Sequence, residues 1–371
     1  MKTEKTKKMW ALLGVFFLLL SHNVVGQFRI TGEYRPRVEF RNGYSILPND
    51  TTTFASLVSQ RSRINFFYEK DKVTTNISIQ DVRVWGEESN LKANTPATGI
   101  YEAWAKVKFS DNFAIKFGRQ ALKYDNGRLI SINDWDQSGS RHDIAILMFE
   151  NDKLKTHVGA AYNQDESKLF GNSYKYNVNN YKSLGILWLN YKFSDVIKGG
   201  IIGIADGKQK NTSDNAIYVR RTYGGNLIYD NKKTNISLYA YHQSGMLPTH
   251  QSVNAYYINP EFSLKVSDIT LTLGNEFISG RYNDTIYKES KVFNLLYGSG
   301  HDFLGYLDYF TPSNLSNQTL YCGMNTSYFK YKHDINDKLN YSLHYYYFNT
   351  KAAIYDNIRQ KDRDKYLGSE M

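Results

Sequence analysis

Apolar and polar residues alternate along much of this chain, most regularly near its start. In the run 28–40, one side would carry Phe28, Ile30, Gly32, Tyr34, Pro36, Val38 and Phe40, and the other Arg29, Thr31, Glu33, Arg35, Arg37 and Glu39. Successive side chains of a strand point to opposite faces, so this period of two predicts a strand with one apolar and one polar face. Pro36 cannot donate a ladder hydrogen bond, which predicts a bulge or a break there.

Similar runs continue along the chain, and we count about fifteen of them. The predicted strands are 28–40, 54–69, 72–85, 100–109, 112–122, 142–150, 153–165, 181–193, 197–206, 216–230, 233–243, 254–265, 269–280, 320–332 and 338–348. In the run 100–109, Tyr101, Ala103, Ala105, Val107 and Phe109 would lie opposite Glu102, Trp104, Lys106 and Lys108. No helical period is sustained for more than two turns, so the fold class is all-β.

Tight polar turns alternate with longer loops between these runs. The seven turns are Lys70-Asp71, Ser110–Asn112, Asn151–Lys153, Ser194-Asp195, Asp230–Lys232, Val266–Asp268 and Asn336-Asp337, and the eight loops are 41–53, 86–99, 123–141, 166–180, 207–215, 244–253, 281–319 and 349–364. Each turn joins two runs of roughly ten residues, the length that a tilted strand needs to cross a bilayer. This pattern is typical of a transmembrane antiparallel up-and-down β-barrel.

The number of strands bears on how such a barrel closes. Barrels of this kind have an even strand count and end in a strand with a terminal aromatic residue. This sequence stops at Gly368–Met371, just after a further strand could begin at Lys365. Because an open strand edge is unstable in lipid, we expect 16–18 strands in the complete barrel and a C-terminally incomplete barrel in residues 27–371.

Residues 1–26 are predicted to be a secretory signal peptide. A charged start containing Lys7 and Lys8 precedes the apolar stretch Trp10–Leu20, and Val25-Gly26 is a plausible cleavage site. The apolar stretch is too short to span a bilayer as a helix, which makes a membrane anchor the weaker interpretation. The predicted location is the outer membrane of a Gram-negative bacterium, with the tight turns in the periplasm and the loops outside.

Composition is compatible with this class. Hydrophobic residues make up 41% of the chain, as expected where every second strand residue faces a wet interior. Aromatic residues make up 15%, and many lie near predicted strand ends, where they would form aromatic girdles. Tyrosine-rich strands also occur in soluble β-proteins. Cys322 is the single cysteine, which excludes an intrachain disulfide.

The net charge is +10, of which +7 lies after residue 26. This positive excess suits either an anionic solute or the phosphates of lipopolysaccharide. Outer-membrane lipid is the other predicted partner. No basic helix or binding motif supports a nucleic-acid partner. The eight histidines lack ligand spacing, so neither a metal nor a cofactor is predicted.

The densest group of unusual residues lies at the predicted outer end of strands 112–122 and 142–150. It comprises Gly118–Ile130 (GRQALKYDNGRLI), Asp134–Gln137 (DWDQ) and Arg141–Asp143 (RHD). At a pore mouth, such side chains could bind carboxylates and hydroxyls of a passing sugar, with arginine suited to bidentate contacts. Alternatively, the charges pair with one another and fix the loop.

This segment resembles the alginate export family of outer-membrane barrels. Two further pieces resemble the family, Gln60–Phe66 (QRSRINF) running into Gln80–Trp85 (QDVRVW), and Gly300–Phe310 (GHDFLGYLDYF). The resemblance implies a barrel of about eighteen strands with an electropositive lumen that passes an anionic polyuronate. The missing C-terminal strands depart from that pattern, and the motifs identify the family better than the solute.

Parity, charge and this resemblance select the candidate residues of the solute path, in the lumen or at its mouth. They are Arg61, Arg63, Asn65, Arg83, Lys106, Lys116, Arg119, Gln120, Tyr124, Asp125, Arg128, Trp135, Asp143 and Arg220. Cations on the wall would concentrate anions in the tube. The alternative is a wall stiffened by pairs between these cations and Glu33, Glu39, Asp81, Glu102 and Glu276. Strict alternation turns Arg119 outward, although a bulge at Gly118 could redirect it.

The loop 281–319 is long enough to suggest a function of its own. It could fold into the lumen as a constriction formed by His301, Phe303, Tyr306, Asp308 and Tyr309, or it could cap the barrel from outside.

The predicted function is passive passage of an anionic or polar carbohydrate without an enzymatic step. A periplasmic partner could deliver the solute. The alternatives are a general diffusion porin, a plugged surface receptor or adhesin, and a hydrolase at the rim that uses His142, His242 or His301 as its base. No Gly-x-Ser-x-Gly, His-Glu-x-x-His or phosphate-loop motif is present.

Overall fold

A computed structural model describes residues 27–43, 48–88, 98–172, 174, 180–211, 215–281, 286–301, 303–310, 322–351, 355–356, 361–362 and 365–371. The predicted signal peptide lies outside these residues. No helix of the described part of the chain is long and apolar enough to cross a membrane.

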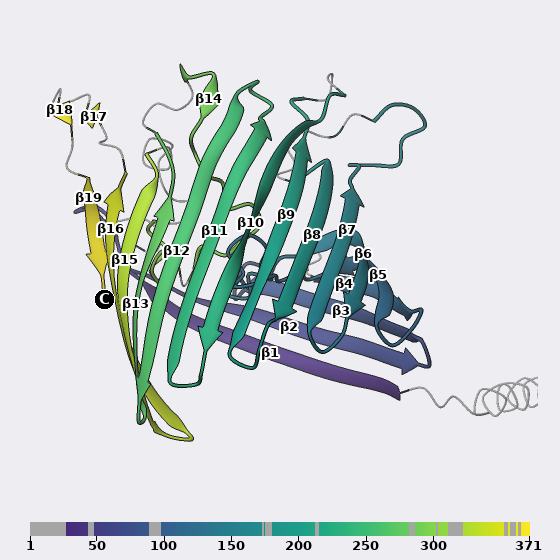
Figure 1. Ribbon diagram of the computed structural model, residues 1–371, viewed down its shortest axis with the longest axis horizontal. Coiled ribbons are helices and arrows are strands. Elements are labelled where there is room, and N and C mark those ends of the chain that lie inside the picture. Colours follow the sequence, from purple (N-terminus) through teal and green to yellow (C-terminus); the bar gives the residue numbers. More distant parts are fainter. Residues whose placement is uncertain are drawn as a thin grey trace, which may run out of the picture.

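The described strands form one large, strongly curved antiparallel sheet, with loops at one end of the strands and tight turns at the other (Figure 1). We call these the loop end and the turn end. The strands are β1 (Gln27–Arg41), β2 (Ala55–Lys70), β3 (Val73–Val84), β4 (Thr98–Lys108), β5 (Phe113–Gln120), β6 (His142–Glu150), β7 (Leu154–Tyr162), β8 (Ser183–Lys192), β9 (Ile197–Lys208), β10 (Tyr218–Asp230), β11 (Thr234–Met246), β12 (Ser252–Val266), β13 (Ile269–Ile278), β14 (Glu289–Ser290), β15 (Met324–Asn336), β16 (Leu339–Thr350) and β19 (Tyr366–Glu370). The pair β17 (Tyr355–Asp356) and β18 (Lys361–Asp362) forms a separate small sheet.

Each long strand pairs with the next one in the chain, which makes the sheet an up-and-down meander. β13 pairs with β15, and β16 with β19, while the two-residue β14 runs parallel to the start of β12. The predicted all-β, up-and-down fold is confirmed. Among the described residues, β1 pairs with β2 and β19 with β16, and no pairing joins β1 to β19.

The two faces of the sheet differ as the alternation predicted. On β1, Phe28, Ile30, Val38 and Phe40 are exposed on the outer face, each by more than half. Glu33, Arg35, Arg37 and Glu39 are half-buried on the inner face. The same outward apolar pattern continues at positions such as Leu147, Leu187, Ile201, Leu227, Leu238 and Leu273. An exposed apolar outer face around a polar inner face is the arrangement that a barrel in lipid requires.

Aromatic side chains gather at the turn end, as the composition predicted. Phe113 packs against Phe149 with ring centroids 4.8 Å apart, and Tyr191 against Phe193 at 5.0 Å. Phe109, Phe113 and Phe193 are exposed on the outer face beside the tight turns. Such rings suit the interface between lipid and water.

Four local predictions are wrong. Pro36 causes no bulge, because β1 and β2 stay in register through the pair Pro36 and Gln60. The predicted strand 320–332 is β15 and begins at Met324. Strand β5 ends at Gln120, because the Ala121 amide donates to Glu102 Oε1 at 2.9 Å and the chain turns away.

The fourth error concerns Tyr101. It does not share the outer face with Ala103, because the register between β3 and β4 shifts after Ser78. The shift leaves Tyr101 as an extra residue and turns its ring to the inner face, where it is 4% exposed under the Arg63 guanidinium.

Candidate functional site in the lumen

Two loops enter the space that the curved sheet encloses. We call residues 121–141, between β5 and β6, the first inner loop. We call the described residues 286–301 and 303–310, between β13 and β15, the second inner loop. Contacts described below tie the first inner loop to β13 on one side and to β1 and β2 on the other, so that it spans the lumen.

On the side of β13, the first inner loop is held by a buried ion pair. Arg128 donates from Nε to Glu276 Oε1 at 2.7 Å and from Nη2 to Oε2 at 2.8 Å, with side chains 0% and 1% exposed. Tyr257 on β12 also donates to Glu276, at 2.7 Å. Arg128 Nη1 donates to the Ser299 carbonyl at 2.5 Å, and the guanidinium lies 4.7 Å from the Phe303 ring centre. Arg128 therefore links the first inner loop both to the wall and to the second inner loop.

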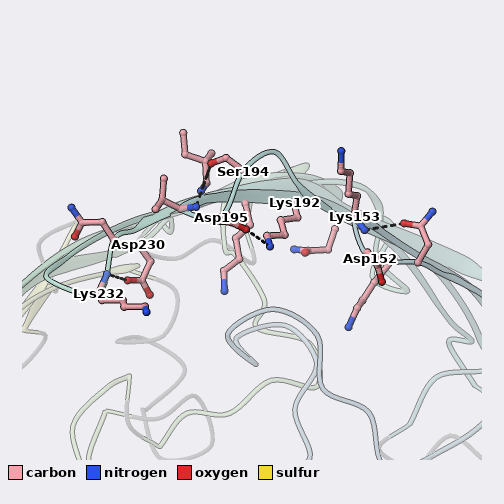
Figure 2. A pocket seen from close by; sticks show the side chains of 14 residues that line it. Asp152, Lys153, Lys192, Ser194, Asp195, Asp230 and Lys232 are labelled. Carbon is pink, nitrogen blue, oxygen red and sulfur yellow. Dashed lines mark hydrogen bonds and ion pairs between the residues drawn. The ribbon is translucent and has the colours of Figure 1, made fainter.

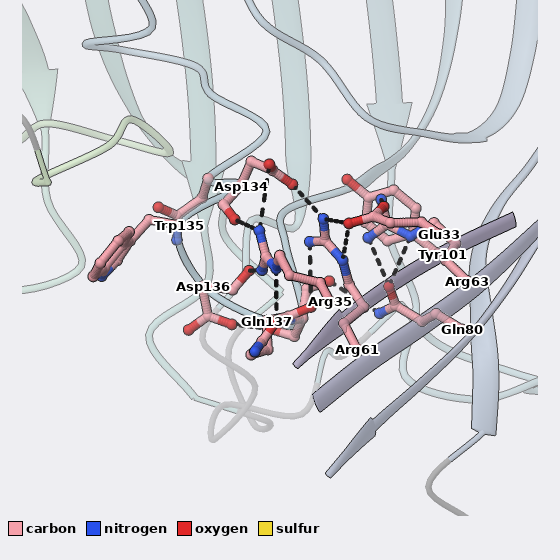
Figure 3. A network of polar contacts seen from close by, with 12 residues as sticks. Glu33, Arg35, Arg61, Arg63, Gln80, Tyr101, Asp134, Trp135, Asp136 and Gln137 are labelled. Carbon is pink, nitrogen blue, oxygen red and sulfur yellow. Dashed lines mark hydrogen bonds and ion pairs between the residues drawn. The ribbon is translucent and has the colours of Figure 1, made fainter. Parts of the chain in front are cut away.

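On the side of β1 and β2, Arg61 and Arg35 hold the opposite end of the same loop (Figure 3). Arg61 Nη2 pairs with Asp134 Oδ1 at 2.9 Å, and its guanidinium also pairs with Glu33. Arg35 donates from Nη1 to the Asp134 carbonyl at 2.7 Å and from Nε to Gln137 Oε1 at 2.9 Å. These bonds fix the backbone of the loop as well as its side chains.

Arg37 and Arg63 complete this wall. Arg37 donates to the Trp135 carbonyl at 2.9 Å and lies over the Trp135 ring at 4.7 Å. Arg63 stacks on Tyr101 at 3.6 Å and donates to Gln80 Oε1 at 2.7 Å, and Gln80 donates in turn to the Ser138 carbonyl. Neither Arg61 nor Arg63 presents an open guanidinium to the lumen, since they are 1% and 9% exposed.

The two inner loops also bind each other. Ile130 and Tyr297 form a parallel bridge, in which the Tyr297 amide donates to the Leu129 carbonyl at 3.0 Å and the Ser131 amide to the Tyr297 carbonyl at 3.1 Å. Gly298 allows this approach, because an added Cβ would lie 1.9 Å from the Arg128 carbonyl oxygen. Further along, His301 stacks on Trp135 with ring centroids 3.9 Å apart.

An apolar core joins the loops to the wall at the loop end. Leu129, Ile130, Phe293, Leu295 and Leu304 of the loops are all buried. They belong to one cluster with the inner-face residues Ile144, Ile146, Leu184, Ile186, Ile202, Ile204, Tyr239, Tyr241, Val253, Ala255, Tyr257 and Ile278. Burial of apolar area of this extent stabilises the loops inside the lumen.

The turn-end half of the inner face is different, because it is polar and carries lysines. Lys106, Lys155, Lys198 and Lys265 lie on this face and form no ion pair with any described residue. Lys116 lies beside them, 3.9 Å above the Trp104 ring. Lys155, Lys198 and Lys265 are exposed to solvent.

The structure places most predicted path residues inside, although not as free contacts. Asn65 faces the lumen, is half-buried and donates to Thr31 on β1. Arg220 and Asp206 are both largely buried and pair at 2.8 Å. Gln120 is buried and donates to the Ile144 carbonyl. At the tip of the first inner loop, Tyr124 bonds to His157 at 3.2 Å and Asp125 accepts from Trp188 at 2.9 Å.

Three residues predicted for the lumen or its mouth lie on the outer face instead. Arg83 shares its face with Ile77 and Ile79 and pairs with Asp81 and Glu88. Arg119 pairs with Asp143 at 2.8 Å, both opposite in facing to Gln120 and His142. Gly118 has a φ of 114°, yet β5 stays in register with β6, so Arg119 keeps the outward position that strict alternation predicts.

The second inner loop does enter the lumen, as one of the two predictions for it stated. His301 bonds to Asp308 at 3.1 Å, Phe303 lies against Arg128, and the Tyr306 amide donates to Glu370. Tyr309 is partly buried beside them. The prediction missed that the first inner loop would span the lumen. The signal was the inward parity of Arg35 and Arg37, two strong donors in need of acceptors.

The histidines considered as bases have other partners. His142 bonds to the Tyr181 hydroxyl at 3.2 Å, and His242 lies between Tyr223 and Asn254 on the outer face. Within the described residues, no group of three or more His, Cys, Asp or Glu side chains is placed to hold a metal ion.

Comparison with known structures shows which proteins share this fold. OccD3 (OpdP) of Pseudomonas aeruginosa superposes with a TM-score of 0.55 at 13% identity, over 88% of this chain and 72% of that chain. OccK8 (OprE) of the same organism gives 0.56 at 10%, over 90% and 86%. OmpT of Vibrio cholerae, an outer membrane protein, gives 0.51 at 11%, over 93% and 96%. The fold is that of the outer-membrane β-barrel porins.

Residues 27–157 match the model of the family described as "Alginate export". The family resemblance drawn from the sequence is thereby confirmed for this part of the chain, which contains β1 to β6, the first inner loop and the start of β7. No curated protein matches the sequence.

Proposed function

We propose that this protein is an outer-membrane conduit through which an anionic carbohydrate diffuses without any covalent step. The observation that carries the proposal is a set of inner-face lysines at the turn end that form no ion pair with a described residue, Lys106, Lys155, Lys198 and Lys265. Uncompensated cations on the wall of a low-dielectric tube raise the local concentration of anions.

The solute class is proposed to be a polyuronate of the alginate kind. The description of the matching family supports this choice, as does the positive inner face. The two inner loops would form the constriction, and the arginines that hold them would set its width. Arg61 and Arg63 act in this proposal through the position of the first inner loop, whereas Lys116 and the four unpaired lysines act on the solute directly.

The proposal includes a location and an orientation. Residues 1–26 would direct the chain to the periplasm and be cleaved, and the barrel would lie in the outer membrane of a Gram-negative bacterium. The turn end would face the periplasm, and the loops would face outward, in contact with lipopolysaccharide. A periplasmic partner that delivers the polymer is compatible with this orientation.

A second candidate is a plugged surface receptor. The buried Arg128–Glu276 pair and the apolar core of the inner loops favour it, because both hold the loops firmly inside the lumen.

Conductance of the full-length protein in a planar lipid bilayer tests the proposal. We expect anion-selective current that an oligouronate blocks in a concentration-dependent manner. Steady current without selectivity or block would instead indicate a general porin. A folded barrel that passes no current would support the plugged receptor.

Replacing Arg61, Arg63 and Lys116 together with glutamine should change ion selectivity. If selectivity stays the same in a variant that folds, these three residues have no part in the solute path.

A further inference from the structure

A pocket of about 500 Å³ lies at the turn end, where three neighbouring tight turns meet (Figure 2). The turns are those between β6 and β7, β8 and β9, and β10 and β11. Five lysines and three aspartates are among its lining residues. Tyr124 and Asp125 of the first inner loop contact His157 and Trp188, which lie two residues further from the turns than Lys155 and Asn190, respectively. The pocket therefore remains open to the lumen.

The sheet register brings three polar side chains together on the lumen side of this pocket. Lys155 on β7 lies directly opposite Asn190 on β8, and Lys192 on β8 lies directly opposite Lys198 on β9. Adjacent strands are about 4.8 Å apart, so the backbones of β7 and β9 are separated by roughly 10 Å. Lys155 thus lies beside the Asn190 amide, and Lys198 lies on the other side of β8, one inner-facing position nearer the turn.

The charges in this pocket are only partly neutralised. Lys192 pairs with Asp195 at 2.6 Å, and Asp230 accepts from the Lys232 amide at 2.9 Å within its own turn. Lys155 and Lys198 are exposed and form no ion pair with a described residue. Two ammonium groups remain available for an anionic ligand.

The turns that surround the pocket are held by their own side chains. Asn151 Oδ1 accepts from the Leu154 amide at 2.7 Å, Ser194 Oγ from the Ile197 amide at 3.0 Å, and Asn231 Oδ1 from the Thr234 amide at 2.6 Å. The lysines are therefore presented from fixed backbone, which lowers the entropy cost of binding.

We propose that this pocket is a receiving site for a carboxylated sugar chain at the turn end of the lumen. Lys155 and Lys198 bind carboxylates of different sugar units, and the Asn190 amide, with a donor and an acceptor, bonds a hydroxyl between them. Two weak contacts on one chain act together, because the second binding event is intramolecular. The proposal rests on the proposed function and names where its solute first binds.

The test uses the full-length protein in a planar bilayer, with an oligouronate added to each side in turn. In the variant K155Q/K198Q, block from the turn end should require about fivefold more oligouronate, since two solvent-exposed ion pairs are lost. Block from the loop end should change less than about twofold. The matched control K72Q/K338Q removes the same charge from two other turns outside the pocket and should leave both unchanged.

Each outcome bears on a different claim. If the wild-type protein is not blocked from either side, the proposed function fails. If the wild type is blocked but K155Q/K198Q matches the control, the receiving site is overturned while the function stands. A neutral oligosaccharide of equal length should not block. Oligoglutamate that blocks as well as oligouronate, with the same loss in K155Q/K198Q, would show a site for any polyanion and overturn the assignment to sugars.

Discussion

The two halves of the lumen carry similar charged residues and use them in opposite ways. At the loop end, Arg61 and Arg128 are buried and paired with carboxylates of the wall or of the first inner loop. At the turn end, Lys155 and Lys198 are exposed and unpaired among the described residues. A buried charge must be paired, since desolvation is costly, whereas an exposed charge is hydrated and remains able to bind a solute. A cation on the inner face is therefore a candidate for solute contact only where its side chain is exposed and unpaired.

The largest effect is expected where the loop-end half is broken at its buried ion pair. Arg128→Ala leaves the Glu276 carboxylate buried without its partner, which should cost about 3–5 kcal/mol. We expect a lower melting temperature and a larger, noisier single-channel conductance as the loops leave the lumen.

Two variants bound this prediction. Arg119→Ala removes an outer-face arginine from a pair with 39% and 55% exposed side chains, and should cost at most about 1 kcal/mol. The double variant Arg128→Met/Glu276→Leu should recover much of the stability, because it leaves no buried charge. Conductance unchanged in Arg128→Ala would show that this pair does not hold the loops.

A smaller effect is expected at the opposite wall. Arg61→Ala removes the bonds to Glu33 and Asp134, but both carboxylates are partly exposed and can be rehydrated, at 37% and 53%. The loss should be about 1.5–3 kcal/mol, the range for hydrogen bonds to charged groups. Melting temperature and conductance measure it, with Arg83→Ala as the outer-face control. Equal losses in the two variants would remove the distinction between the faces.

In the turn-end half, we expect altered selectivity with little change in stability. Lys106→Gln/Lys265→Gln removes two unpaired cations and should lower the anion-to-cation permeability ratio by about twofold at low salt. The effect should shrink as salt rises, because the Debye length falls from about 30 Å at 0.01 M to about 3 Å at 1 M. The reversal potential in a salt gradient measures the ratio, and an effect that does not depend on salt would argue against an electrostatic cause.

The smallest effect concerns pH at the tip of the first inner loop. Burial raises the pKa of the Asp125 carboxyl above its ordinary value. The folded state then holds this proton more tightly than the unfolded chain does, so the contribution of Asp125 to stability is full below the unfolded pKa and is lost as pH rises through the folded one. Acidification from neutral pH should steady the loop.

Asp125→Asn should remove that dependence, because the amide does not titrate and its oxygen can still accept from Trp188. Conductance noise recorded between neutral and acidic pH compares the two proteins. The same pH response in both would assign it to another group.

The sequence by itself predicted the elements and their faces. The period of two placed Phe28 and Ile30 outside and Arg61 and Arg63 inside, because side-chain direction in a strand is a local property. It could not place Tyr101, which a register shift in β4 turned inward. Nor could it choose between solute contact and wall pairing for Arg61, because that choice depends on a loop about seventy residues away.

The sequence thus determined the class of fold and the rhythm of turns and loops, since both follow from neighbours along the chain. The tertiary structure decided which cations form buried ion pairs and which remain exposed to the lumen. Arg128 meets Glu276 across 148 positions, and Lys155 lies one strand away from Lys198 across β8, so both arrangements depend on how the chain is placed in the sheet. Burial at the loop end and exposure at the turn end follow from that placement and from where the two inner loops pack.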